Sequence, residues 1–340
     1  MGLFTKKTDG QNPTPLEGVD AVLADLDGVV YQGPDPIPHA VDSLLRVSSE
    51  GLRVGYITNN ASRTDSQVAE HLSSFGLQVA PHDVVTSPQA AMRLMATLID
   101  PGATVLVVGG VGLVSEVEKA GFVVTRSVDD RPAAVVQGFA PEVGWTQLAE
   151  ASFALHDPAV HWVATNTDWT IPVARGIAPG NGTLVSAVHT AVGRLPVVAG
   201  KPETPIFEVA KDRFGASNAA FIGDRLDTDT MGAKRAGLRA IHVLTGIDRA
   251  KQLLAAPKGQ RPDFIVDDLR QLFDPYPATI VSKDGSETRV GASVVRMQGH
   301  VVRVVKAGDS ATDLVRAGAA AIWNSGLSIH ALDVAPEIYA

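Results

Sequence analysis

A chain of 340 residues is long enough for roughly two or three domains. Its formal net charge of −8 argues against a general nucleic-acid binder, which presents a basic face. The absence of cysteine excludes disulfides, a thiolate nucleophile and cysteine-bound zinc. Since the sequence also contains no apolar run long enough to cross a bilayer, we expect neither a nucleic-acid partner nor membrane insertion.

Residues 1–16 are polar and contain no apolar signal core, so a disordered lead-in and a cytoplasmic location are predicted. The first strand follows, in an apolar run that begins at Ala21 and is interrupted by Asp25 and Asp27 before Gly28 lets the chain turn. Open α/β sheets bind ligands at the carboxyl ends of their strands. Two carboxylates in one pocket are unfavourable without a compensating positive charge, which favours a divalent-cation site, catalytic or passive. A solvated turn is the alternative.

A helix is predicted over 39–49, where apolar residues lie near helical spacing. The next buried strand ends in Thr58, Asn59 and Asn60, ahead of a helix expected over about 66–75. A hydroxyl, two carboxamides and unpaired backbone N–H groups at this place suit phosphate binding. An ordinary helix cap is the alternative interpretation.

Between Ser87 and about Leu195, alternating strands and helices predict a separate α/β unit with a mostly parallel sheet. The expected helices are 89–99, one opened by GGVGL that ends at Ala120, 145–156, and 184–193. The GGVG segment lacks the spacing of a dinucleotide loop and the lysine of a phosphate loop. A tight turn from strand to helix is the favoured interpretation.

Three further charged residues follow predicted strands in the next part of the chain. Lys201 lies between a strand and a helix, Asp224 follows the apolar strand AAFIG, and Asp229 comes five residues later. A lone lysine in a loop is normally a solvated charge, but its place at a strand end favours a functional role. The strand RAIHVLTG, a helix beginning at Asp248, the strand DFIVDDL and a short helix to Phe273 then complete this part.

Four segments resemble, in order, the four motifs of the haloacid dehalogenase (HAD) superfamily: DLDGVV, TNN, the lysine of GKPETP, and GDRLDTD. The resemblance implies an α/β fold with a Rossmann-like core and parallel sheet (17–86 and 196–275) and an inserted α/β cap (87–195). ATNTDWTIPVARGIAPGNGTL resembles the cap signature of the NagD-like, p-nitrophenyl-phosphatase-like branch, and this places Asp168 near the substrate. Ile171 stands where pyridoxal-phosphate phosphatases of the branch have a histidine, which weakens a pyridoxal assignment.

The resemblance also implies roles for the motif residues. Asp25 is the expected nucleophile, and Asp27 the general acid and base. Mg²⁺ is expected on Asp25, the backbone carbonyl of Asp27 and Asp224, with Asp229 supporting the metal through water or holding Lys201.

Substrate phosphate is expected to contact Thr58, Asn59, Asn60 and Lys201. Asn59 and Asn60 are also candidates for orienting the leaving group or Asp27. Because the net charge repels a phosphorylated substrate at long range, the attraction must be local, through a lysine, backbone amides and a metal.

These roles imply a Mg²⁺-dependent phosphomonoesterase acting on a small phosphorylated metabolite. Glycerol 3-phosphate is the preferred substrate, since a core followed by such a tail looks most like actinobacterial glycerol-3-phosphate phosphatases. Phosphoglycolate, pyridoxal phosphate and nucleotides are the alternatives. A phosphotransferase or mutase, which protects its aspartyl-phosphate from water, and a non-catalytic regulatory protein are the alternatives of another class.

Residues 278–340 are predicted to form a small α+β C-terminal extension. We expect strands at ATIVS, TRVGASVVRM and VVRVVKAG, a helix capped by Asp309 that ends at Trp323, and a further strand at LSIHAL. The order loosely resembles part of the GNAT acetyltransferase fold. KAGDSATD lacks that family's pyrophosphate-binding pattern, so acetyl-CoA binding is not predicted. A packing, dimerising or substrate-restricting module is expected, with a homodimer forming through the cap or this extension.

Overall fold

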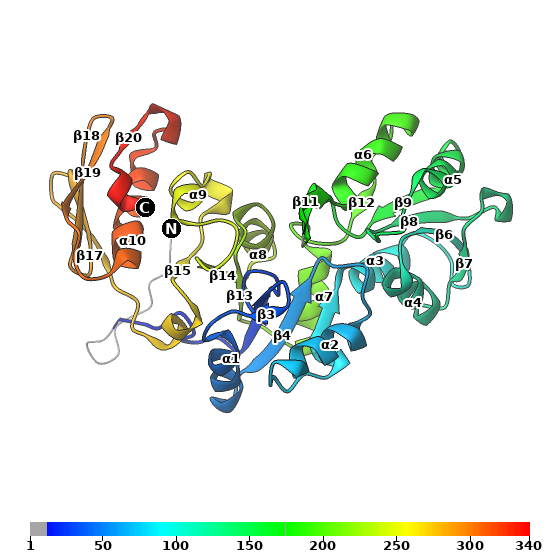
Figure 1. The fold of residues 1–340 in the computed structure, drawn as a ribbon, viewed down its shortest axis with the longest axis horizontal. Coiled ribbons are helices and arrows are strands. Elements are labelled where there is room, and N and C mark those ends of the chain that lie inside the picture. Colours follow the sequence, from blue (N-terminus) through cyan, green and yellow to red (C-terminus); the bar gives the residue numbers. More distant parts are fainter. Residues whose placement is uncertain (1–11, 174) are drawn as a thin grey trace.

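The computed structural model describes residues 12–173 and 175–340. Three sheets and their helices lie in a row, with the sheet of the first strand in the middle (Figure 1). The central sheet is parallel, has the order β15-β14-β13-β1-β4-β5, and carries helices on both faces. Its strands are β1 (Ala21–Ala24), β4 (Arg53–Thr58), β5 (Val84–Thr86), β13 (Ala219–Gly223), β14 (Arg239–Val243) and β15 (Phe264–Val266).

Alternate side chains of β1 enter two different clusters of buried apolar residues. Val22 and Ala24 pack with α1 (Ala40–Ser49) and α2 (Asp65–Ser74) on one face. Leu23 packs with α3 (Ser87–Met95), α7 (Pro205–Phe214) and α8 (Met231–Arg235) on the opposite face. This two-sided burial explains why the first strand is an unbroken apolar run. The short helix α9 (Ala250–Leu254) follows β14 and packs in the apolar cluster of the C-terminal part.

The second sheet has the order β12-β9-β8-β6-β7 and is also parallel. It consists of β6 (Thr104–Val108), β7 (Val123–Thr125), β8 (Ala134–Gln137), β9 (His161–Ala164) and β12 (Val197–Val198), with α4 (Val111–Lys119), α5 (Trp145–Leu155) and α6 (Asn181–Val192) around it. A hairpin of β10 (Thr170–Val173) and β11 (Gly176–Pro179) joins β9 to α6. α3 packs against both α7 and α4, so one apolar cluster runs from the central sheet into the second.

Two elements of the central part differ from the expectation. The short strand before Lys201, expected to resume the core, pairs in parallel with β9 and so extends the second sheet. The helix expected from Asp248 begins at Ala250. The Asp248 backbone N–H donates to the carbonyl of Asp224, and its carboxylate accepts from the Leu226 amide. These bonds hold Asp248 outside the helix.

The C-terminal sheet, β16-β17-β18-β19-β20, is antiparallel except for its last pair, and it packs on the long helix α10. Its elements are β16 (Thr279–Val281), β17 (Glu287–Val290), β18 (Ser293–Gln298), β19 (Val301–Lys306), α10 (Ala311–Ser325) and β20 (Asp333–Val334). The segment expected as a single strand, TRVGASVVRM, is divided by a turn at Gly291, where φ is +56°. Ser310, not Asp309, caps α10, and LSIHAL contains a 3₁₀ turn instead of a strand.

The remaining elements are short. They are β2 (Tyr31–Gln32), β3 (Asp35–Pro36), a π-helical turn at Leu226–Thr230, and 3₁₀ turns at Pro81–Asp83, Val128–Asp130, Lys258–Gln260, Leu269–Phe273, Ile329–Ala331 and Pro336–Ile338. Of the expected disordered lead-in, residues 1–11 lie outside the described residues. Leu16 is buried, and the carbonyl of Pro13 accepts from the Tyr276 amide. Within the described ranges, no helix is both long and apolar enough to span a membrane.

Candidate active site

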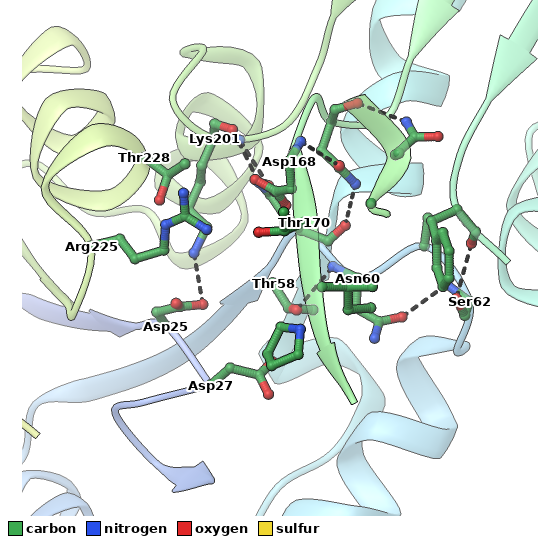
Figure 2. A pocket seen from close by; sticks show the side chains of 18 of the residues that line it. Asp25, Asp27, Thr58, Asn60, Ser62, Asp168, Thr170, Lys201, Arg225 and Thr228 are labelled. Carbon is green, nitrogen blue, oxygen red and sulfur yellow. Dashed lines mark hydrogen bonds and ion pairs between the residues drawn. The ribbon is translucent and has the colours of Figure 1, made fainter. Parts of the chain in front are cut away.

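A cavity of about 520 Å³ lies at the carboxyl end of the central strands. Asp25, Asp27 and Thr58 line it from the central sheet, and Asp168 and Thr170 line it from the segment around β10 (Figure 2). The central sheet and the segment around the β10–β11 hairpin therefore contribute walls to one pocket. This is the place where open α/β sheets bind their ligands.

Three carboxylates gather on the floor of this cavity. Asp25 directly follows β1, Asp224 directly follows β13, and Asp229 lies in the π-helical turn that comes next. β1 and β13 are adjacent and parallel, so their ends meet. One oxygen from each of the three carboxylates lies within 4.8 Å of the others, and all three residues are buried.

Lys201 is the buried cation beside these acids. Its Nζ lies 2.7 Å from Oδ1 of Asp25 and 2.7 Å from Oδ1 of Asp229, and its side chain is only 3% exposed. Burial alone lowers the pKa of Lys201, but Asp229 and Asp25 together raise it above its ordinary value. The lysine is therefore charged, and it contributes one positive charge beside the three carboxylates.

Burial and the crowding of negative charge change the pKa values of these acids. Burial, followed by the Asp229 carboxylate, raises the pKa of Asp25 well above its ordinary range and that of Asp224 to about 7. Buried carboxylate oxygens in excess of their cations are the donor set that hard divalent ions prefer. The residues present therefore fit Mg²⁺ or Ca²⁺.

Gly28 and the neighbouring backbone leave just enough room for Asp224. Gly28 has a φ of +81°, and a Cβ at this position would lie 2.3 Å from Oδ2 of Asp224. The same Oδ2 accepts a hydrogen bond from the Ile247 amide at 2.7 Å. Only glycine combines the backbone conformation and the missing side chain that this approach requires.

Asp27 faces the cavity and is not packed into the interior. Partial desolvation by the surrounding walls is the largest influence on its carboxyl group and raises its pKa, although Lys201 and Arg63 act in the opposite direction. A carboxyl group that keeps its proton to higher pH is suited to donate it.

Thr58 and Asn60 form the turn between β4 and α2. The Asn60 N–H donates to Oγ1 of Thr58 at 3.1 Å, and the Asn60 carboxamide oxygen accepts from the amides of Ser62, at 2.8 Å, and Arg63. Thr58 lines the cavity (Figure 2), and its hydroxyl group donates no hydrogen bond to another described residue. The cap of α2 is Thr64, so Asn60 shapes the turn ahead of the helix and is not its cap.

Asn59 is occupied by bonds within the protein. Its Oδ1 accepts from the Lys201 amide at 2.8 Å, and its Nδ2 donates to the Lys201 carbonyl at 3.0 Å and to Oδ2 of Asp168 at 3.1 Å. Its backbone carbonyl accepts from the side chains of Ser87 and Asn166. The Asn59 carboxamide thus joins the lysine loop to the wall that carries Asp168.

Several cavity residues were not predicted from the sequence. They are Tyr31, Arg63, His71, Arg225 and Thr228. Arg225 and Thr228 lie inside GDRLDTD, so their closeness to Asp224 in the sequence could have predicted that they line the cavity. Tyr31 lies in β2, Arg63 in the turn ahead of α2 and His71 on α2, and no local pattern marks them.

Comparisons with known proteins identify the family. A model described as haloacid dehalogenase-like hydrolase matches residues 22–123, and a second model of the same type matches residues 198–272. The D-glycerol 3-phosphate phosphatase of Mycobacterium tuberculosis is 42% identical over 308 residues, which are 90% of this chain and 86% of that protein. The chain belongs to the haloacid dehalogenase-like hydrolases.

Solved structures of HAD-like phosphatases agree with this assignment. The crystal structure of glycerol phosphate phosphatase from M. tuberculosis in complex with magnesium has a TM-score of 0.84 at 40% identity, covering 93% of this chain and 94% of that one. p-Nitrophenyl phosphatase from Archaeoglobus fulgidus has a TM-score of 0.69 at 28% identity, covering 75% of this chain and 98% of that one. The expected membership of the p-nitrophenyl-phosphatase-like branch of the HAD superfamily is confirmed.

Proposed function

We propose that this protein is a Mg²⁺-dependent phosphomonoesterase that hydrolyses glycerol 3-phosphate through an aspartyl-phosphate on Asp25. The observation that carries the proposal is the position of Lys201, 2.7 Å from both Asp25 and Asp229, in the same buried cluster as Asp224. Such an arrangement supplies a nucleophile, an oxygen-rich cation site and a fixed positive charge at one point of the cavity floor.

The cation site consists of the carboxylates of Asp25 and Asp224 and the backbone carbonyl of Asp27. A bound Mg²⁺ supplies positive charge that orients the phosphate and reduces its repulsion by the acids. Asp229 supports this site indirectly. Its Oδ2 accepts from the amides of Asp224, at 3.2 Å, and Arg225, and its Oδ1 faces Lys201.

The reaction then proceeds in two displacements at phosphorus. An Asp25 oxygen forms a bond to phosphorus while the bond to the alcohol oxygen breaks, and Asp27 donates its proton to that departing oxygen. Asp27, now ionised, removes a proton from a water molecule that attacks the aspartyl-phosphate. Inorganic phosphate leaves, and both carboxyl groups return to their starting states. The raised pKa of Asp27 supports its role as the acid.

Charge that develops on the transferring phosphoryl oxygens is stabilised by groups already in position. Lys201 is held by two carboxylates, and the Thr58 hydroxyl lines the same cavity. A donor that needs no reorganisation during the reaction contributes more than a mobile one. Asn59 contributes by holding Lys201 and Asp168, since both the oxygen and the nitrogen of its carboxamide already have partners within the protein.

Glycerol 3-phosphate is supported as the substrate by the named activity of the M. tuberculosis relative. Polar side chains, among them Asn60 and Asp168, line the same cavity as Asp27 and can bind hydroxyl groups. Ile171 lines this cavity too, in place of the histidine of the pyridoxal-phosphate phosphatases. Phosphoglycolate is the nearest alternative substrate.

A panel of phosphate esters tests the proposal. Phosphate release by the purified protein with Mg²⁺ is measured for glycerol 3-phosphate, phosphoglycolate, pyridoxal phosphate and nucleotides, and kcat/KM is expected to be highest for glycerol 3-phosphate. Asp25→Asn is the control and is expected to abolish turnover while the protein stays folded. Near-full activity in Asp25→Asn refutes the nucleophile, whereas a higher kcat/KM for another ester refutes only the substrate.

Two expectations about the protein as a whole stay predictions. A homodimer through the cap or the C-terminal extension is tested by light scattering. A cytoplasmic location is tested by fractionation of the cells that make the protein.

A further inference from the structure

His242 is a fully buried titratable residue that takes no part in the proposed reaction. It lies in β14, next to β13, the strand that Asp224 directly follows, and none of its surface is exposed. Its Nε2 lies 2.8 Å from the backbone carbonyl of Asp248, and its Nδ1 has no hydrogen-bond partner among the described residues. Burial lowers its pKa, so the ring is neutral and Nε2–H donates to the carbonyl.

A buried imidazole with one unsatisfied nitrogen is costly. An unpaired buried polar group destabilises a fold, and an aliphatic side chain would fill the same place without that cost. The bond to Asp248 is the one hydrogen bond that His242 makes through its side chain within the described part of the chain. The role of His242 is therefore inferred from the contacts of Asp248 and the residues next to it.

The loop Thr245–Asp248 connects β14 to the acid cluster. The Ile247 amide donates to Oδ2 of Asp224 at 2.7 Å, and the Asp248 amide donates to the backbone carbonyl of Asp224 at 3.1 Å. The Thr245 hydroxyl donates to the carbonyl of Gly28 at 2.7 Å. The loop thus contacts both the side chain and the backbone of Asp224.

Gly246 shows how closely the loop packs on this carboxylate. A Cβ at Gly246 would lie 2.0 Å from Oδ2 of Asp224, so there is no space between the loop backbone and the carboxylate. A small displacement of the loop therefore moves or releases the Asp224 oxygen. His242 holds the far end of this loop through the Asp248 carbonyl.

We propose that His242 is a positioning residue that holds the loop Thr245–Asp248 against Asp224 and thereby sets the affinity of the site for its divalent cation. The proposal rests on the proposed function, because it takes Asp224 to be a cation ligand. Groups that orient a metal ligand affect metal affinity by about 10–100-fold when they are removed.

Isothermal titration of the full-length protein with Mg²⁺, without substrate, tests this role. His242→Leu removes the donor and keeps an apolar side chain, and it is expected to raise the Kd for Mg²⁺ by about tenfold or more. His242→Gln, whose amide can reach the Asp248 carbonyl, is expected to recover most of the affinity.

A matched control is His189→Leu. His189 Nδ1 lies 2.7 Å from the carbonyl of Arg194, so this variant also loses a contact between a histidine ring and a backbone carbonyl, but at the end of α6. It is expected to bind Mg²⁺ like the wild type. Melting temperatures in EDTA establish that each variant is folded. If His242→Leu does not fold, His242→Asn, which is too short to reach Asp248, replaces it in the comparison with His242→Gln.

The outcomes separate the two proposals. Wild-type Mg²⁺ affinity in His242→Leu, or equal affinity in His242→Asn and His242→Gln, overturns the role of His242 while Asp224→Asn still loses the cation. Absence of Mg²⁺ binding in the wild type overturns both this role and the proposed function. Weak binding in His242→Leu together with recovery in His242→Gln supports the role.

Discussion

The side-chain amide of Asn59 binds both polar groups of the Lys201 backbone: Oδ1 accepts the N–H at 2.8 Å, and Nδ2 donates to the carbonyl at 3.0 Å. Gly200 makes this approach possible, since a Cβ there would lie 2.6 Å from Oδ1 of Asn59. The position of the lysine ammonium therefore depends on a residue at the end of another strand.

Replacement of Asn59 by alanine is predicted to lower kcat/KM by about 10²-fold, because misplacement of a charged group by about 1 Å has an effect of this size. Steady-state phosphate release measures the change. Asn218→Ala is the control, since Asn218 also donates to a backbone carbonyl but lies exposed, away from the cavity. Equal activity in the two variants would contradict the positioning role.

The meeting of Asp25 and Asp224 was predictable, whereas the role of Asn59 was not. Each of the two acids follows a buried strand, and parallel strands of one sheet end at one edge, so a local pattern was sufficient. The bond from Asn59 to Lys201 joins residues 142 positions apart. The residues on either side of Asn59 in the sequence contain no pattern that indicates this distant partner. Sequence alone therefore assigned Asn59 to the substrate.

The strand before Lys201 shows a similar limit. A two-residue strand such as β12 carries no periodicity from which its partner can be inferred, and Val197 and Val198 fit either sheet. In the structure β12 pairs in parallel with β9. The turn at Gly291 was hidden for a related reason, because the apolar residues on both sides continue the strand pattern through it.

Replacement of Lys201 by methionine is predicted to lower the free energy of unfolding by about 3–5 kcal/mol at pH 8, since it leaves buried carboxylates without their cation. The loss should be smaller at pH 5, where these carboxyl groups take up protons. Urea denaturation in EDTA measures both values. Lys234→Met is the control, because the pair of Lys234 with Asp263 lies at the surface, where such pairs contribute about 0.2–1 kcal/mol. Similar losses in both variants would refute the prediction.

Replacement of Asp224 by asparagine is predicted to stabilise the metal-free protein above about pH 7. Burial and Asp229 raise the pKa of Asp224 from 3.8 to about 7 in the folded state. The folded protein therefore binds this proton more tightly than the unfolded chain, and the wild type loses stability as the pH rises from about 4 to 7. Asp224→Asn has no proton to lose at this position, so its stability does not fall for this reason as the pH rises. Urea denaturation in EDTA between pH 5 and 8 should show the two curves separating as the pH increases, and parallel curves would disprove the assignment.

The same proton should compete with the metal. Because Asp224 and Asp25 both have raised pKa values in the metal-free protein, a cation that binds to their ionised forms must displace protons at low pH. We predict that the Kd for Mg²⁺ is several-fold higher at pH 6 than at pH 8, and that binding at pH 6 releases protons. Calorimetric titrations in two buffers of different ionisation enthalpy measure both quantities. Ca²⁺ serves as the comparison, since it takes the same oxygen ligands and should show the same direction. A Kd that is the same at pH 6 and pH 8 would contradict this prediction, because it would mean that both carboxylates are already ionised at pH 6 in the metal-free protein.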